Sequence, residues 1–165
     1  MKCIKKLVAV ALAAVLALAM LTACDGSSNV PNATEQAEQI VNSINEVRTQ
    51  NGLEALKTNT TATDVAAKMV DLYVKSYQNE ITKEEYKTKR DELRNIQVEG
   101  KYHYGTMTLH DKASGENILT KDAWTKKYAN KDKAAKLAFG SRGEYIGAAV
   151  KTMSNGKMVA IIVFY

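Results

Sequence analysis

The end of the chain constrains the fold most, because two strand-forming runs there are joined by a tight turn. Residues 145–152 and 158–165 are rich in β-branched and aromatic side chains, and Asn155-Gly156 between them is a dipeptide favoured in hairpin turns. Residues 159–164 are apolar almost throughout, which is typical of a strand covered on both faces. We therefore expect an α/β fold in which helices pack on both sides of the sheet.

Two amphipathic helices are predicted in the first half of the chain. Residues 34–51 place apolar side chains on one helical face, and Gly52 is suited to end that helix with a positive φ. A second helix is expected to begin after Thr61 or Thr63 and to bury a stripe of side chains reaching Tyr77.

A third helix and a strand are predicted in the middle of the chain. Thr82 and Glu85 have the spacing of a capping box, so a helix should begin there and run to about Asn95. Its many charges are typical of a solvent-exposed face, and a specific binding role is the alternative. Residues 102–109 alternate in the manner of a strand, with His103 on the same side as Met107.

The amino terminus has the features of an export signal. Residues 7–21 form an apolar run of 15 residues, shorter than the roughly 20 needed for a membrane-spanning helix. The run ends in Leu21-Thr22-Ala23-Cys24, which resembles the lipobox of bacterial lipoprotein precursors, where the cysteine is acylated and cleavage precedes it. Cys24 is then the lipidation site, and its acyl chains anchor the protein to the membrane, which is its partner. The protein would lie on the outer face of the cytoplasmic membrane or on the cell surface. The alternative is ordinary signal cleavage with Cys24 incidental.

These features divide the chain into residues 1–23 as signal peptide, 24–33 as polar tether and 34–165 as one folded domain. Loss of the three signal lysines lowers the net charge from +5 to about +2, which gives no case for a nucleic-acid partner. Cys3 leaves with the signal and Cys24 is acylated, so no disulfide is expected in the mature chain.

Two short helical stretches are expected around Trp124 and over residues 134–139. Six lysines make this the most basic part of the mature chain, and they are Lys121, Lys126, Lys127, Lys131, Lys133 and Lys136. A solvated lysine face is the simpler interpretation, and contact with an anionic envelope polymer is the alternative.

A polar turn, Ser114-Gly115-Glu116-Asn117-Ile118, combines a carboxylate and a carboxamide with a glycine. The glycine allows a sharp bend, which suits either a turn beside a groove or a polar loop that caps a helix. If the Glu116 carboxylate is buried it needs donors, and it would then fix the helix that carries Trp124 to the sheet. On that interpretation Glu116→Ala should reduce stability.

Taken together, these pieces resemble the CAP superfamily (cysteine-rich secretory proteins, antigen 5 and pathogenesis-related 1) in its bacterial branch. The matches are residues 44–53, 115–118, Trp124 and 146–150, the last with the Asn-Gly hairpin. The resemblance implies a three-layer α-β-α sandwich with a central, mainly antiparallel sheet, and within it residues 78–100 would be a helical insertion.

Many members of this family carry two histidines and two acidic residues around a cleft, and some bind a divalent cation there. Glu116 matches one acid, but Lys127 and Ala134 occupy the positions of the other acid and of the later histidine. His103 or His110 could replace the earlier histidine. Two potential ligands are too few for a firm site, so no tight metal binding and no cofactor are expected. The cleft candidates are Glu116, Asn117, His110, His103 and Trp124.

The resemblance and the incomplete site favour a non-catalytic, membrane-anchored binding module that binds envelope polymer, a small apolar ligand or a protein partner. The rival hypothesis is a secreted hydrolase, acting on peptide or cell wall, with His110 or His103 as base, Glu116 as its orienting carboxylate and a nearby Ser or Thr as nucleophile. A histidine exposed beside Glu116 would favour the enzyme, and separation would favour binding. A host-facing surface protein is a third possibility that nothing in the sequence selects.

Overall fold

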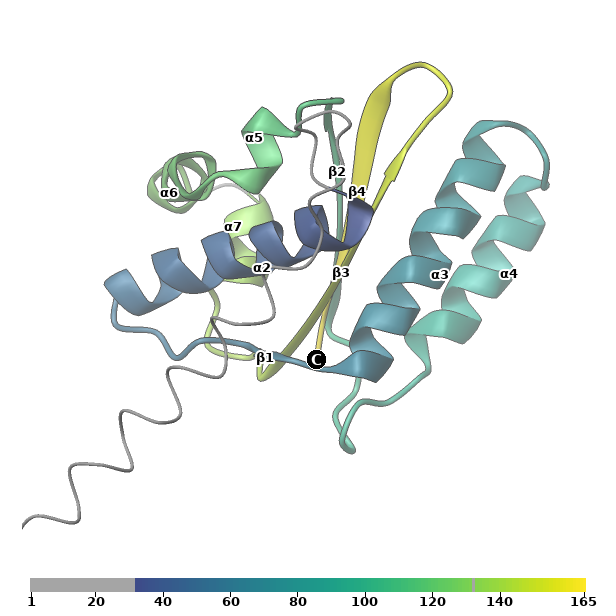
Figure 1. Cartoon of the computed structure of the whole chain (residues 1–165). Helices are drawn as coiled ribbons and strands as arrows, with labels where there is room; N and C mark the ends of the chain where they lie inside the picture. Colours follow the sequence, from purple (N-terminus) through teal and green to yellow (C-terminus); the bar gives the residue numbers. More distant parts are fainter. Residues whose placement is uncertain (1–31, 132) are drawn as a thin grey trace, which may run out of the picture. The chain divides into compact units, whose positions relative to one another are not determined.

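The computed structural model describes residues 32–131 and 133–165, and element labels follow Figure 1. The signal peptide, Cys24 and nearly all of the tether therefore lie outside the described residues. A four-stranded sheet lies between two groups of helices (Figure 1). This arrangement confirms the predicted α/β fold with a mainly antiparallel sheet.

The elements follow the chain in a simple order. The helices are α2 (Ala33–Gln50), α3 (Thr60–Tyr77), α4 (Lys83–Arg94), α5 (Glu116–Leu119), α6 (Lys121–Ala129) and α7 (Lys133–Ala138). The strands are β1 (Lys57–Thr58), β2 (Gly105–Lys112), β3 (Tyr145–Thr152) and β4 (Lys157–Phe164).

The strands are arranged in the order β1-β3-β4-β2. Strand β4 pairs antiparallel with both β2 and β3, so Phe164 lies between Gly105 and Ile146. Strand β1 is parallel to β3 but pairs with it only at Tyr145 and Ile146. Within the part of the chain that the structure describes, most of the outer edge of β3 therefore has no strand beside it.

Alternate residues of β4 enter two separate hydrophobic clusters. Met158, Ala160, Ile162 and Phe164 face α2, α5, α6 and α7, which we call the α2 side of the sheet. Val159, Ile161, Val163 and Tyr165 face α3 and α4, which we call the α3 side. The nearly continuous apolar run arises because both faces of this strand are buried, as predicted.

The long helices begin where side chains can cap them. Asn32 accepts hydrogen bonds from the first turn of α2, and Thr82 forms the predicted capping box with Glu85 at the start of α4. Helix α3 begins at Thr60, earlier than expected, because Asn59 rather than a threonine caps it. The prediction that Tyr77 is buried is wrong, since its side chain is 51% exposed.

Strand β1 is short, and tertiary contacts position it. The Asn45 amide exchanges two hydrogen bonds with the backbone of Leu56, and the Lys57 N–H donates to the Glu144 carbonyl. The chain then turns into α3, whose first turn crosses β3 at Gly147. A Cβ at Gly147 would lie 2.2 Å from the carbonyl carbon of Ala62, so only glycine allows this crossing.

Candidate functional site

The Gly-Glu-Asn turn is organised by a buried aspartate of β2. Asp111 is 8% exposed, and its carboxylate accepts hydrogen bonds from the backbone N–H and the side-chain amide of Asn117. It also accepts from the backbone N–H of Lys112. Gly115 precedes the turn of helix with φ +64°, and a Cβ there would collide with the Leu119 side chain. Glycine at this position is therefore required both by φ and by packing.

Glu116 does not have the structural role expected of it. The side chain is exposed in the first turn of α5, and it forms no hydrogen bond to the residues that the structure describes. The expectation that a buried Glu116 fixes the helix of Trp124 is thus wrong. Instead the Trp124 indole donates to the Ile118 carbonyl at 2.8 Å, and the Ser43 hydroxyl donates to the Leu119 carbonyl at 2.6 Å.

Both histidines lie on the α3 side of the sheet. His110 is exposed on the same face of β2 as Thr106 and Thr108, and its Nε2 is 3.1 Å from the Tyr73 hydroxyl of α3. His103 precedes β2, and its Nε2 is 2.7 Å from the Thr106 hydroxyl. The expected alternation put His103 with Met107, and this was wrong because the strand begins only at Gly105.

The environment of His103 favours the neutral imidazole. Burial, with repulsion from the Arg94 guanidinium, lowers its pKa from 6.5 to about 4. Its ring also contacts Tyr165 edge-on, with 5.5 Å between the centroids. His103 is thus a packed and hydrogen-bonded residue rather than an open base.

The sheet separates the residues that a His-Glu site would need. Glu116 and Asn117 lie on the α2 side, where Asn117 is bound to Asp111. On the α3 side, His110 contacts Tyr73 of α3, and His103 contacts Thr106 and Tyr165. Trp124 is fully buried in the α2-side cluster and lines no cleft. The structure therefore joins Asn117 to Asp111, and it brings neither histidine to Glu116.

The described residues contain no group of three or more His, Cys, Asp or Glu side chains that could hold a metal ion. Nor does any helix in this part of the chain combine the length and the apolar character needed to cross a membrane.

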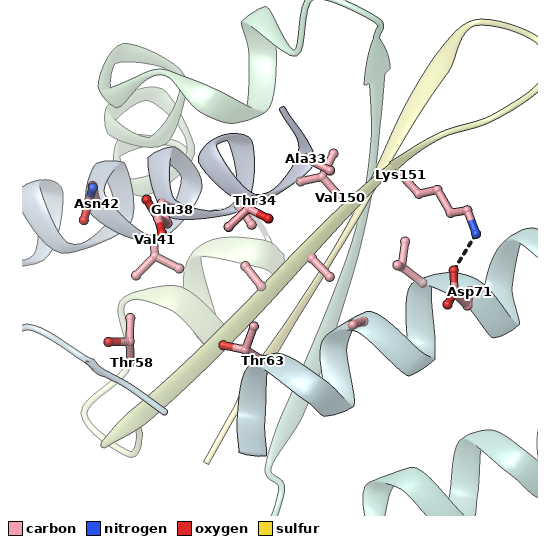
Figure 2. A pocket seen from close by; sticks show the side chains of 15 residues that line it. Ala33, Thr34, Glu38, Val41, Asn42, Thr58, Thr63, Asp71, Val150 and Lys151 are labelled. Carbon is pink, nitrogen blue, oxygen red and sulfur yellow. Dashed lines mark hydrogen bonds and ion pairs between the residues drawn. The ribbon is translucent and has the colours of Figure 1, made fainter. Parts of the chain in front are cut away.

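A groove lies elsewhere, between α2 and α3 at the edge of β3. It has a volume of about 580 Å³, within the range of small-molecule sites. Figure 2 shows side chains from both helices and from β3 converging on it. We call it the α2–α3 groove, and none of the five cleft candidates lines it.

Small side chains make the groove open. Its walls include Ala33, Ala37 and Val41 of α2 and Ala67 and Val70 of α3. Its floor is the segment of β3 from residue 148 to 151, in which Ala148 and Val150 belong to the α2 side and Ala149 to the α3 side. The groove thus straddles the edge of the sheet.

Charged groups lie at the rim. Lys151 of β3 forms an ion pair with Asp71 of α3 at one end of the groove (Figure 2). Glu38 of α2 lines the groove, is exposed and forms no ion pair with any described residue. Threonine hydroxyls and the Asn42 amide supply further polar groups, but the described residues of the lining include no histidine and no cysteine. This composition suits recognition better than acid-base catalysis.

The sequence contained one signal that could have identified Asp111. In β2 the buried residues are Gly105, Met107 and Asp111, and Leu109 between them is half-buried, so an aspartate occupies an inward position of an alternating strand. A carboxylate at such a position must find donors nearby. The groove had no comparable signal, because it depends on where β1 ends and on how two helices diverge.

Comparisons with known proteins give the fold. No protein-family model matches the chain, and no curated protein matches it. A solved structure of a cysteine-rich secretory protein from Staphylococcus aureus matches with a TM-score of 0.53 and 16% identity. The match covers 84% of this chain and 41% of that protein, so this chain spans less than half its length. The likeness establishes a CAP-like fold.

An outer surface protein from Borrelia burgdorferi is also similar, with a TM-score of 0.44 and 15% identity over 79% of this chain and 91% of that protein.

Proposed function

We propose that this protein is a membrane-anchored, non-catalytic binding module of the bacterial cell envelope and that its ligand occupies the α2–α3 groove. The observation that carries the proposal is the pairing of a largely apolar groove of about 580 Å³ with a polar centre that contains no His-Glu pair. A groove whose described lining includes no histidine and no cysteine supports binding rather than turnover.

The location is part of the same proposal. The signal-like run of residues 7–21 and the lipobox-like residues 21–24 support export followed by acylation of Cys24. Similarity to a secreted bacterial protein agrees with an extracytoplasmic site. The membrane is then the partner of the amino terminus, and the domain presents its groove to envelope polymer, a small apolar ligand or another protein.

A fatty-acid labelling experiment tests the anchor. Cells expressing the full chain are grown with an alkynyl fatty acid, and we expect label on the wild type but not on Cys24→Ser. Label that persists in the variant would contradict acylation at this residue.

A groove-filling variant tests the binding site. Ala67 is exposed on α3 and lines the groove, so Ala67→Trp should fill it without disturbing the core. Thr88→Trp on exposed α4 is the matched control. We expect envelope material to be retained by the wild type and by Thr88→Trp and to be lost from Ala67→Trp, as measured by mass spectrometry of the purified, acylated protein in nanodiscs.

The rival enzyme hypothesis makes a different prediction for the same preparations. Hydrolysis of peptide or cell-wall substrate that disappears in His110→Gln would establish catalysis and overturn the binding proposal. Equal retention of envelope material by the wild type, Ala67→Trp and Thr88→Trp would exclude the groove as the binding site.

A further inference from the structure

We propose that the ligand of the α2–α3 groove is an extended peptide that carries a basic side chain and pairs with the free edge of β3 as an added strand. This inference rests on the proposed function, in which the groove is the binding site, and it names the chemical class of the ligand.

The hydrogen bonds of β3 identify which backbone groups face the groove. Tyr145 and Tyr165 exchange both backbone hydrogen bonds, at 3.0 Å each. In an antiparallel pair such exchanges recur at every second residue, so the backbone N–H and C=O groups of the odd-numbered residues of β3 point to β4. The N–H and C=O groups of the even-numbered residues point to the opposite edge. The hydrogen bond from Lys57 N–H to the Glu144 carbonyl on that edge agrees.

Two residues of β3 therefore present outward N–H and C=O groups that no described residue pairs. Strand β1 ends at Thr58, opposite Ile146, so it does not reach Ala148 or Val150. The outward N–H and C=O groups of these two residues form no hydrogen bond with other described residues outside the ladder. Ala148 is 4% and Val150 6% exposed. Buried backbone groups need partners, and no described residue supplies them here, which leaves these groups available to a ligand in the groove.

An extended backbone matches these groups in number and spacing. The two N–H and two C=O groups alternate along β3, and a strand beside it presents acceptors and donors at the same repeat of about 3.3 Å per residue. A lipid chain would leave all four groups unsatisfied, and the hydroxyl groups of a sugar lack the regular alternation of donor and acceptor that a strand provides. Strand addition of this kind obtains affinity from the main chain and specificity from alternate side chains.

The walls of the groove define the side chains that fit. Alternate residues of an added strand point to opposite faces of the sheet. One set would meet Ala37 and Val41 of α2, and the other would meet Ala67 and Val70 of α3. These small walls leave room for medium-sized apolar side chains on both sides.

The charges of the groove select a basic rather than an acidic peptide. Lys151 is already paired with Asp71, so neither adds net charge to the site. Of the described acidic residues that line the groove, Glu38 is the one that forms no ion pair with a described residue. A lysine or arginine at an α2-facing position of the peptide would complement it.

A peptide library tests the inference on the full mature protein in nanodiscs. The probes are positional-scanning pools of acetylated pentapeptide amides with Lys or Glu fixed at successive positions, and binding is measured by affinity selection and mass spectrometry. We expect Lys pools to bind better than Glu pools and Glu38→Lys to reverse that preference.

Proline at Ala148 tests the main-chain contacts. Ala148→Pro removes an N–H that faces the groove, not the ladder to β4, and proline is tolerated at such edge positions. We expect at least tenfold weaker peptide binding with an unchanged fold by circular dichroism. Equal affinity in this variant would overturn strand addition.

Methylated peptides keep the test valid even if the proline variant does not fold. In the best peptide from the library, N-methylation of one alternate set of residues should abolish binding to the wild type, and methylation of the other set should leave it intact. If N-methylation of neither set weakens binding, the inference is overturned. It is also overturned if no peptide pool binds. Envelope material that Ala67→Trp releases but that no peptide displaces would leave the groove as the binding site and exclude a peptide ligand.

Discussion

The two sides of the sheet are stabilised in different ways. On the α2 side, buried polar groups hold loops and short helices by hydrogen bonds to backbone, as Arg48, Asp111 and Ser43 do. On the α3 side, a long helix packs mainly through apolar side chains, and the polar groups there include the half-buried His103 and the hydroxyl of Tyr165. Within the described residues, the four buried polar or charged side chains all belong to α2 or to the α2-facing side of β2.

This difference shows how irregular segments are held against a sheet. Helices α5 to α7 are short, so few of their backbone groups are paired within the helix, and neighbouring side chains must supply partners. Helix α3 has 18 residues and pairs its own backbone, so apolar contact is sufficient to hold it. We therefore expect substitutions of polar groups to cost far more on the α2 side.

The largest effect is expected for Arg48. Its guanidinium donates to the carbonyls of Glu54, Ala138 and Gly140, and burial lowers its pKa. Arg48→Met would leave these acceptors unpaired and should reduce the free energy of unfolding by about 3 kcal/mol. Urea denaturation measures this change, and Arg94→Met, at an exposed arginine of α4, is the control. Equal effects of the two substitutions would contradict the contrast between the sides.

The second effect distinguishes the two carboxylates near the Gly-Glu-Asn turn. Asp111→Ala removes the acceptor for Asn117 and Lys112 and should reduce stability by about 2 kcal/mol. Glu116→Ala, at an exposed side chain without such partners, should stay within about 0.5 kcal/mol. Thermal unfolding of both variants gives the comparison. A larger loss in Glu116→Ala would restore the structural role that the sequence suggested for it.

The third effect concerns the α3 side and is a dependence on pH. Because the pKa of His103 falls to about 4 on folding, the unfolded chain binds its proton first, so stability should decrease as the pH falls from 6.5 towards 4. Partial solvent exposure reduces the size of this term to roughly 1 kcal/mol. His103→Gln should lose this part of the slope in denaturation curves taken between pH 7 and 4. His110→Gln is the control for loss of an imidazole. If stability depends on pH in the same way in His103→Gln as in the wild type, the lowered pKa of His103 is not the cause.

The smallest effect is expected at the carboxyl terminus. The Tyr165 side chain is buried and its hydroxyl has no hydrogen-bond partner in the described structure, and burial raises its pKa. Tyr165→Phe removes an unsatisfied polar atom, so stability should stay unchanged or rise by up to about 1 kcal/mol. A loss above that size in calorimetry would mean that the hydroxyl has a partner and that the α3 side also depends on polar contacts.

Particular residues show which parts of the fold could be predicted. The β3–β4 hairpin, the capping box at Thr82 and the first helix were predictable because their signals are local in sequence. The start of α3 and the start of β2 were misplaced by a few residues. The start of α3 was misplaced because Asn59, and not one of the two threonines near it, caps the helix. The start of β2 was misplaced because the alternating sequence pattern begins before Gly105, the first residue of β2 that pairs in the sheet.

The candidate site was predicted less well, because closeness in sequence does not fix the face on which a side chain lies. His110 and Glu116 are six residues apart, yet the pleat of β2 directs the histidine to the α3 side and the next turn carries the glutamate to the other. The Gly-Glu-Asn motif was identified from the sequence as a polar turn. Its stabilising carboxylate, Asp111, was not.

The sequence by itself determined that helices cover both faces of a sheet, since residues 159–164 would otherwise expose apolar side chains to water. Only the tertiary structure decided that the histidines and Glu116 are separated and that β1 ends at Thr58, leaving the edge of β3 open between α2 and α3. The physical reason is that burial of apolar surface is encoded by the pattern of one segment. The position of a polar side chain or a groove depends instead on how several segments meet.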